Sequence, residues 1–232
     1  MRASPVKSAT FPQRGMFLHR RIARAARLLP GDRSGLALVE FAMSFPLLLL
    51  MATGGLELAN YVITLKRVGE IAGMVADNAS RMGSQAVINN QPVSEAEIND
   101  VFTGADLQGG KLDLSHNGRI ILSSLQRNAD GGQTIKWQRC FGALAQPSAY
   151  GTEGKGATGT SFTGMGPTNN EVAAADNTAV MVVEINYQYQ RIMPLLQLPL
   201  SMIRDVTAFN VRDSRDLSQP QNTENVTAAT CS

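Results

Sequence analysis

The chain has 232 residues, of which 44% are hydrophobic and 17% charged, and its formal net charge is +2. This length suits one membrane helix and one modest folded domain. The sequence has no nucleic-acid recognition motif, no zinc knuckle and no interleaving of basic and aromatic residues, which argues against a nucleic-acid-binding protein. The only histidines, His19 and His116, lie on opposite sides of a long apolar segment, so no metal cluster or Cys–His pair emerges.

Basic residues are concentrated at the N-terminus. Residues 1–35 contain eight Lys or Arg and one Asp, whereas the rest of the chain contains 13 basic and 18 acidic side chains. A basic tract directly before an apolar segment keeps that flank in the cytoplasm. We therefore expect a single-pass protein with a cytoplasmic N-terminus, although Lys66 and Arg67 are a minor contrary signal. Residues 1–35 are then either a leader that is removed or a permanent cytoplasmic tail.

The apolar segment covers residues 36–65, and because about 20 residues suffice to cross a bilayer as a helix, it predicts a transmembrane helix. Glu40 lies inside it. A carboxylate in hydrocarbon costs several kcal/mol, which makes Glu40 a functional candidate; the alternative is that it lies at the headgroup boundary. Pro46 removes a backbone hydrogen bond and predicts a helix kink.

A second carboxylate, Glu57, limits how the segment can sit in the membrane. The uncharged stretch between Glu40 and Glu57 spans roughly 24 Å as a helix, less than the roughly 30 Å hydrocarbon core. We therefore expect a thinner bilayer or a paired glutamate. Asn60 and Lys66 are the nearby candidates for Glu57.

Cleavage after Gly35 would make Leu36 the amino terminus and place its amine about one helical turn from Glu40. The order of a basic leader, Gly35, four mostly apolar residues, Glu40, Phe41 and an apolar helix resembles the prepilin-peptidase signature. Together with the segments 46–50 and 55–57, it makes residues 33–82 similar to the TadE-like pseudopilins of the tight-adherence (Flp) pilus system. The resemblance implies cleavage by a prepilin peptidase between Gly35 and Leu36 in the bacterial inner membrane. It also implies assembly with other pilins or pseudopilins through Glu40 and Phe41.

Residues 66–83 continue the helix as an amphipathic extension. An apolar stripe recurs at spacings of three and four residues and predicts docking on a soluble domain. The stripe consists of Leu65, Val68, Ala72, Val75, Ala79 and Met82. Residues 84–212 form that extracytoplasmic domain, in which a capping box at residues 94–97 predicts a short helix ending near Phe102.

Five segments have strand patterns: 111–115, 119–126, 133–141, 178–190 and 202–211. In residues 178–190 one face is fully apolar and should pack on the long helix. In residues 133–141, Ile135 and Trp137 share a face whose alternation Arg139 interrupts. Residues 142–177 are expected to form a flexible loop, and residues 213–232 are expected to form a polar tail. The expected fold is α+β, with a long N-terminal helix on a small, mostly antiparallel sheet, as in pilins.

Cys140 and Cys231 both lie on the predicted outer side, where an oxidising compartment favours a disulfide, two free thiols being the alternative. Nothing places a nucleophile beside a base. We therefore expect no catalytic residue, metal, cofactor or small-molecule substrate, and a protein that is not an enzyme. The two functional hypotheses are a pseudopilin that takes part in pilus assembly and a permanently anchored envelope binding domain that is not processed at Gly35.

Overall fold

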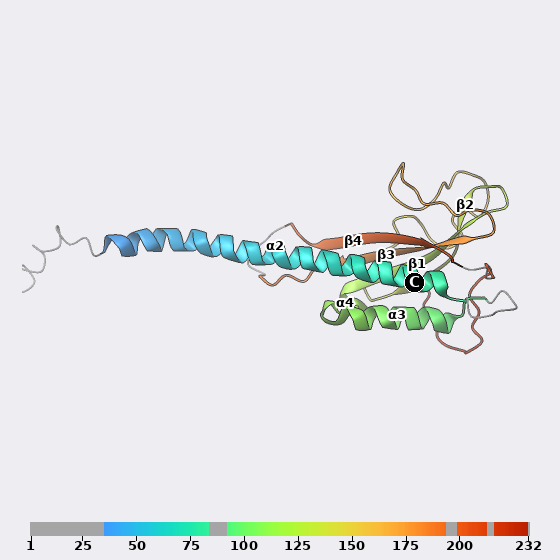
Figure 1. Ribbon diagram of the computed structural model, residues 1–232, viewed down its shortest axis with the longest axis horizontal. Helices are drawn as coiled ribbons and strands as arrows, with labels where there is room; N and C mark the ends of the chain where they lie inside the picture. The colour runs from blue at the N-terminus through green and yellow to red at the C-terminus, as the bar shows by residue number, and fades with distance from the viewer. Residues whose placement is uncertain (1–34, 84–91, 194–198, 213–215, 232) are drawn as a thin grey trace, which may run out of the picture. The chain divides into compact units, whose positions relative to one another are not determined.

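The computed structural model describes residues 35–83, 92–193, 199–212 and 216–231 (Figure 1). All of the predicted leader except Gly35 therefore lies outside the described residues. The chain divides into two compact units, residues 1–53 and residues 54–232. The elements are α2 (Leu36–Arg81), α3 (Glu95–Gly109), the 3-10 turn η2 (Gly110–Leu112), α4 (Leu114–Asn117), β1 (Gly118–Arg127), β2 (Gln133–Phe141), β3 (Ala179–Gln188) and β4 (Met202–Asn210).

The described part of the first unit is the beginning of α2. Its residues up to Ala52 are exposed, and most of them are apolar. α2 is long and apolar enough to cross a membrane. The helix continues through Pro46, and the kink predicted there stays a prediction.

The second unit is built on a four-stranded open sheet with the strand order β2-β1-β3-β4. Every neighbouring pair is antiparallel, which confirms the predicted α+β class. The four strands agree with the predicted segments to within two residues at each end. The alternation of side chains in these segments is sufficient to locate them because the strand period is two.

One face of the sheet packs against helices α2 and α3, which lie side by side in Figure 1. The face of β3 that was predicted to meet the long helix does so, and it shares one core with the apolar stripe of α2. The α2 and β3 members of this core are Val68, Ile71, Ala72, Val75, Ala76, Ala79, Ala179, Met181, Val183, Ile185 and Tyr187. Leu65, the first residue of the predicted stripe, is 42% exposed instead.

The long loop between β2 and β3 covers the opposite face of the sheet. Met165 and Ala174 from this loop are buried against Ile135, Val180 and Val182. The loop also protects the outer edge of β2, where the backbone of Ile135 exchanges hydrogen bonds with residues 154 and 155. The loop thus serves as a second layer over the sheet, and its predicted flexibility stays a prediction.

The predicted strand 111–115 is wrong, because this segment forms η2 and α4. Asp113 lies between the two turns with a φ of 50°, a left-handed conformation that a strand cannot contain. Leu112 and Leu114 are both buried, and their spacing of two residues imitates a strand. The predicted end of α3 near Phe102 is also too early. The helix continues to Gly109, where an added Cβ would lie 2.9 Å from a methyl carbon of Leu114.

The predicted shared face of Ile135 and Trp137 is wrong as well. Ser124 pairs with Trp137 and Leu125 with Ile135, so Lys136 has no partner in the ladder. A bulge of this kind moves the following side chains to the other face. Ile135 accordingly packs under the long loop, whereas Trp137 enters the core beneath the helices.

Candidate functional site

The cleavage motif predicted from the sequence lies at the very beginning of α2. Gly35 immediately precedes the helix, and its carbonyl accepts a hydrogen bond from the amide of Val39 at 3.1 Å. Glu40 is exposed, with no ion pair to any residue that the structure describes. Phe41 is 57% exposed and stacks on Phe45 with ring centroids 5.1 Å apart. Both predicted assembly side chains are therefore accessible.

Glu57 is in a different situation, because its carboxylate is folded into the domain and only 1% of the residue is exposed. One carboxylate oxygen accepts a hydrogen bond from the Tyr189 hydroxyl at 2.8 Å. The other accepts the backbone amides of Ile192 at 3.1 Å and Met193 at 2.9 Å. The Asn60 side-chain amide donates to the Tyr189 oxygen at 2.7 Å. We call these five residues the Glu57 clasp.

The clasp provides one of the two outcomes expected from the spacing of Glu40 and Glu57, namely a paired glutamate. Glu57 is paired, with Asn60 as an indirect partner, while Lys66 pairs with Glu70 at 3.7 Å. Thr64, beyond the clasp, is also buried. The C-terminal part of the predicted span 36–65 thus belongs to the folded domain, and the part of α2 that precedes the clasp ends at Leu56.

Tyr189 is the member of the clasp that sequence reasoning placed only in part. Its ring was expected to face the long helix, and it meets Tyr61 edge-on with centroids 5.1 Å apart. Its hydroxyl partner was not predicted, since 132 residues separate the two side chains. Burial raises the pKa of the Tyr189 hydroxyl, which keeps it protonated and able to donate to Glu57.

A second cluster of charges surrounds Arg139 in β2. Its side chain is 10% exposed, and its guanidinium donates to Glu95 at the start of α3 through Nε at 2.9 Å and also through Nη2. Nη1 donates to Glu153 at 3.3 Å and to the carbonyl of Gln138 at 2.8 Å. Glu95 raises the pKa of Arg139 chiefly through the hydrogen bond between them. The residue that interrupted the strand alternation is therefore half of a buried ion pair.

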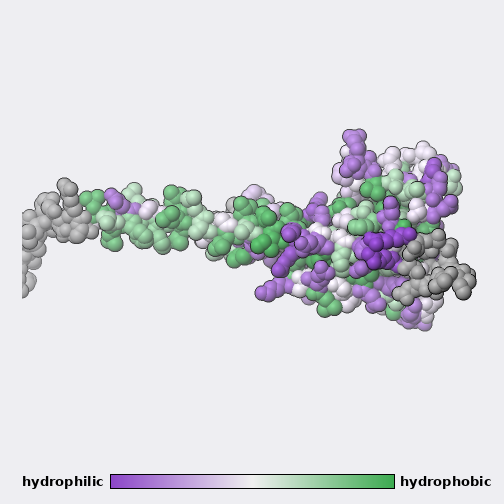
Figure 2. Space-filling view, in the orientation of Figure 1, coloured by the Kyte–Doolittle hydropathy of each residue, from purple (hydrophilic) through white to green (hydrophobic). Residues whose placement is uncertain are grey.

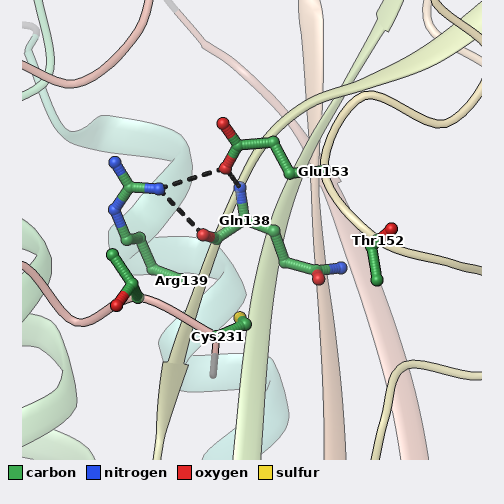
Figure 3. A pocket seen from close by; sticks show the side chains of 6 residues that line it. Gln138, Arg139, Thr152, Glu153 and Cys231 are labelled. Atoms are coloured by element: carbon green, nitrogen blue, oxygen red, sulfur yellow. Dashed lines mark hydrogen bonds and ion pairs between the residues drawn. The ribbon is translucent and has the colours of Figure 1, made fainter.

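The ion pair lies beside the predicted disulfide, which the structure contains. The sulfurs of Cys140 and Cys231 are bonded, with a sequence separation of 91 residues. In Figure 3, Glu153 and Arg139 point toward each other beside Gln138, and Cys231 lies next to them. They line a recess of about 160 Å³. Every nitrogen of the Arg139 guanidinium is already hydrogen-bonded. The ion pair joins β2 to α3, and the disulfide joins the C-terminal segment to β2.

Ser115, His116 and Asp113 are the closest approach to a catalytic constellation in the described chain. The Asp113 carboxylate and the Ser115 hydroxyl lie 2.7 and 3.3 Å from Nδ1 of His116, so both contact the same ring nitrogen. A Ser-His-Asp triad instead needs the serine and the carboxylate on opposite nitrogens. The hydrogen bond between His116 and Asp113 raises the pKa of the imidazole and lowers that of the carboxyl group. These exposed contacts belong to a turn.

The described residues contain no group of three or more His, Cys, Asp and Glu that could hold a metal ion. The structure therefore brings together two constellations, the Glu57 clasp and the Arg139 ion pair, and both join segments far apart in the sequence. The predicted residues Gly35, Glu40 and Phe41 stand apart from them at the start of α2. Comparisons of the chain with protein-family models, curated proteins and solved structures found no match.

Proposed function

We propose that the protein is a TadE-like minor pseudopilin that takes part in the assembly of tight-adherence (Flp) pili. One observation carries the proposal. A single helix, α2, begins as an exposed apolar segment and ends as the core helix of an α+β domain. An assembly subunit that is held in a membrane until it joins its partners needs both parts. The prepilin-peptidase-like motif at Gly35 and Glu40 lies at the beginning of the apolar part.

The proposed location is the bacterial inner membrane, with the domain on the periplasmic or extracellular side. The basic residues 1–35 support a cytoplasmic N-terminus. The Cys140–Cys231 disulfide supports a domain that matures in an oxidising compartment. Cytoplasmic proteins rarely keep such a bond, so the two signals agree on one orientation.

The proposed role of Glu40 follows from the cost of burying charge. After cleavage, the new amine of Leu36 and the Glu40 carboxylate both lie at the membrane end of α2. Neither is well solvated in a bundle of apolar helices, and a buried unpaired charge is strongly unfavourable. Pairing Glu40 with the amine of a neighbouring subunit removes this cost and sets the register between the helices. Prepilin peptidase and other pilins or pseudopilins are therefore the proposed partners.

Two measurements test the proposal. Mass spectrometry of the protein extracted from membranes of cells that make the peptidase should identify Leu36 as the first residue. A Glu40→Leu variant should still insert into the membrane but should reduce piliation and co-purification with pilus components. Glu70→Leu is the matched control, since Glu70 is an exposed carboxylate on the same helix. Normal piliation with Glu40→Leu would show that Glu40 has no part in assembly.

The alternative is a permanently anchored envelope domain that binds a ligand through residues 142–177. One observation favours it, a wide recess in that loop beside Lys155 and Phe162. Lys155, however, lies over the Phe162 ring and donates to the carbonyl of Tyr150, so its ammonium already has partners. Recovery of an intact Met1 from the membrane would favour this alternative over the pseudopilin.

A further inference from the structure

Exposed apolar side chains of the folded unit gather where α2 joins it. Five of them lie on α2 or on the turn of the Glu57 clasp, and between 53% and 62% of each is exposed. We call them the apolar base: Leu56, Leu58, Val62, Ile63 and Ile192. In Figure 2, hydrophobic residues predominate on the part of α2 that precedes the folded unit, whereas hydrophilic residues predominate on the visible surface of the domain. A soluble domain has no reason to concentrate such side chains at one end.

The Glu57 clasp fixes the position of this base along α2. The backbone amides of Ile192 and Met193 bind the Glu57 carboxylate directly, so the turn after β3 lies at the level of Glu57. The clasp also satisfies the buried carboxylate with three hydrogen-bond donors. A carboxylate with that many partners can lie close to hydrocarbon at little cost.

The length of the free part of α2 then places Glu57 relative to a bilayer. From Leu36 to Leu56 the helix has about 20 residues, which span roughly 30 Å, the thickness of the hydrocarbon core. No further turn of α2 between this segment and Glu57 separates the domain from the membrane. We propose that the apolar base rests in the headgroup layer of the bilayer that α2 crosses, so that the lipid surface is a second binding partner of the domain. The inference rests on the membrane anchoring in the proposed function and adds a specific orientation of the domain.

The charges around the base favour an anionic lipid surface. Arg191 adjoins Ile192 of the base, Arg67 lies on α2 roughly 15 Å beyond Glu57, and Arg204 lies on β4 next to Asp205. None of the three forms an ion pair with a described acidic residue. Two acidic side chains oppose them: Glu70, which is paired with Lys66, and Asp205, which lies against Gly69. Unpaired basic groups beside exposed apolar side chains are the composition of an interfacial segment.

The test uses the full chain, reconstituted into vesicles with or without phosphatidylglycerol, and measures protection of a single introduced cysteine. Ile192→Cys reports on the base. Leu107→Cys is the control, since Leu107 is a 79% exposed apolar residue of the same domain. Leu107 is near Gly109, which lies beside Ile71, and Ile71 is roughly 21 Å beyond Glu57 along α2. The native cysteines are bonded to each other and do not react.

We expect a membrane-impermeant maleimide to react about tenfold more slowly at position 192 than at 107, with stronger protection in anionic vesicles. A bimane at position 192 should be quenched by spin-labelled lipid. Equal maleimide rates in a chain that co-floats with the vesicles would overturn the inference and leave the anchoring intact. Protection without lipid quenching would also overturn it, in favour of a second copy. Failure to co-float would instead contradict the anchoring itself.

Discussion

The buried ion pair between Arg139 and Glu95 should be the largest single-residue contribution of charge to the stability of the domain. A Glu95→Ala change leaves the guanidinium 10% exposed with Glu153, which is itself 43% exposed, as its remaining carboxylate at 3.3 Å. Breaking a buried pair by removing one partner costs about 3–5 kcal/mol, because it leaves a desolvated charge without a partner. Since Glu153 compensates in part, we expect the lower end, about 3 kcal/mol.

The single tryptophan makes this change measurable. Trp137 is two residues from Arg139 in β2 and only 2% exposed, so its fluorescence reports directly on this part of the sheet. With an m value of about 2 kcal/mol/M in urea, a loss of about 3 kcal/mol lowers the unfolding midpoint by about 1.5 M. The titration is carried out on the full chain in detergent with the disulfide oxidised in every variant.

Two further variants separate the ion pair from its surroundings. Replacing both Glu95 and Arg139 by Met removes the two charges together, and should restore the free energy of unfolding to within about 1 kcal/mol of the wild-type value. Asp176→Ala breaks a comparable but exposed pair with Arg127, and should cost less than about 1 kcal/mol. If Glu95→Ala shifts the midpoint no more than Asp176→Ala does, the reasoning about a desolvated Arg139 is wrong.

Three other changes have expected outcomes in the same unfolding assay. Cys231→Ser, which opens the disulfide with Cys140, should cost about 4–5 kcal/mol for a separation of 91 residues, and reductant should then have no further effect. Burial raises the pKa of Glu184 in the folded state above its pKa in the unfolded chain. The protonated Glu184 side chain therefore contributes stability at low pH, and this contribution is lost as the pH rises through the pKa of the folded state. Glu184→Gln should therefore flatten the loss of stability as the pH rises above about 4, and an unchanged slope would assign that loss to other groups. Tyr189→Phe keeps the ring but removes the donor to Glu57, and should cost about 1.5–3 kcal/mol; no change in midpoint would show that the clasp carries no stability.

Local patterns predicted those parts of the fold whose side chains follow one regular period. The capping box at the start of α3 is present, with Ser94 accepting from the amide of Glu97 and Glu97 accepting from that of Ser94. The apolar stripe of α2 and the alternating face of β3 meet in one core, as expected. These predictions succeeded because the buried face of a helix or strand repeats along the sequence itself.

The errors arose where tertiary contacts outweigh the local pattern. Leu112 and Leu114 alternate like a strand, but they are buried by two successive turns that place Asp113 in a left-handed conformation. Lys136 is an extra residue in β2 that separates Ile135 from Trp137, and no feature of residues 133–141 alone announces a bulge. The alternation of side chains within one strand cannot show where two of its residues lie opposite a single residue of the neighbouring strand.

By itself, the sequence determined the apolar helix, the amphipathic extension, the strand segments and the motif around Gly35 and Glu40. Each of these depends on neighbouring residues. Only the tertiary structure decided which charged groups are paired. Glu57 and Tyr189 are 132 residues apart, and Glu95 and Arg139 are 44 apart. A buried carboxylate takes whichever donors the fold brings within about 3 Å, and that choice is made by the packing of the sheet on α2 and α3.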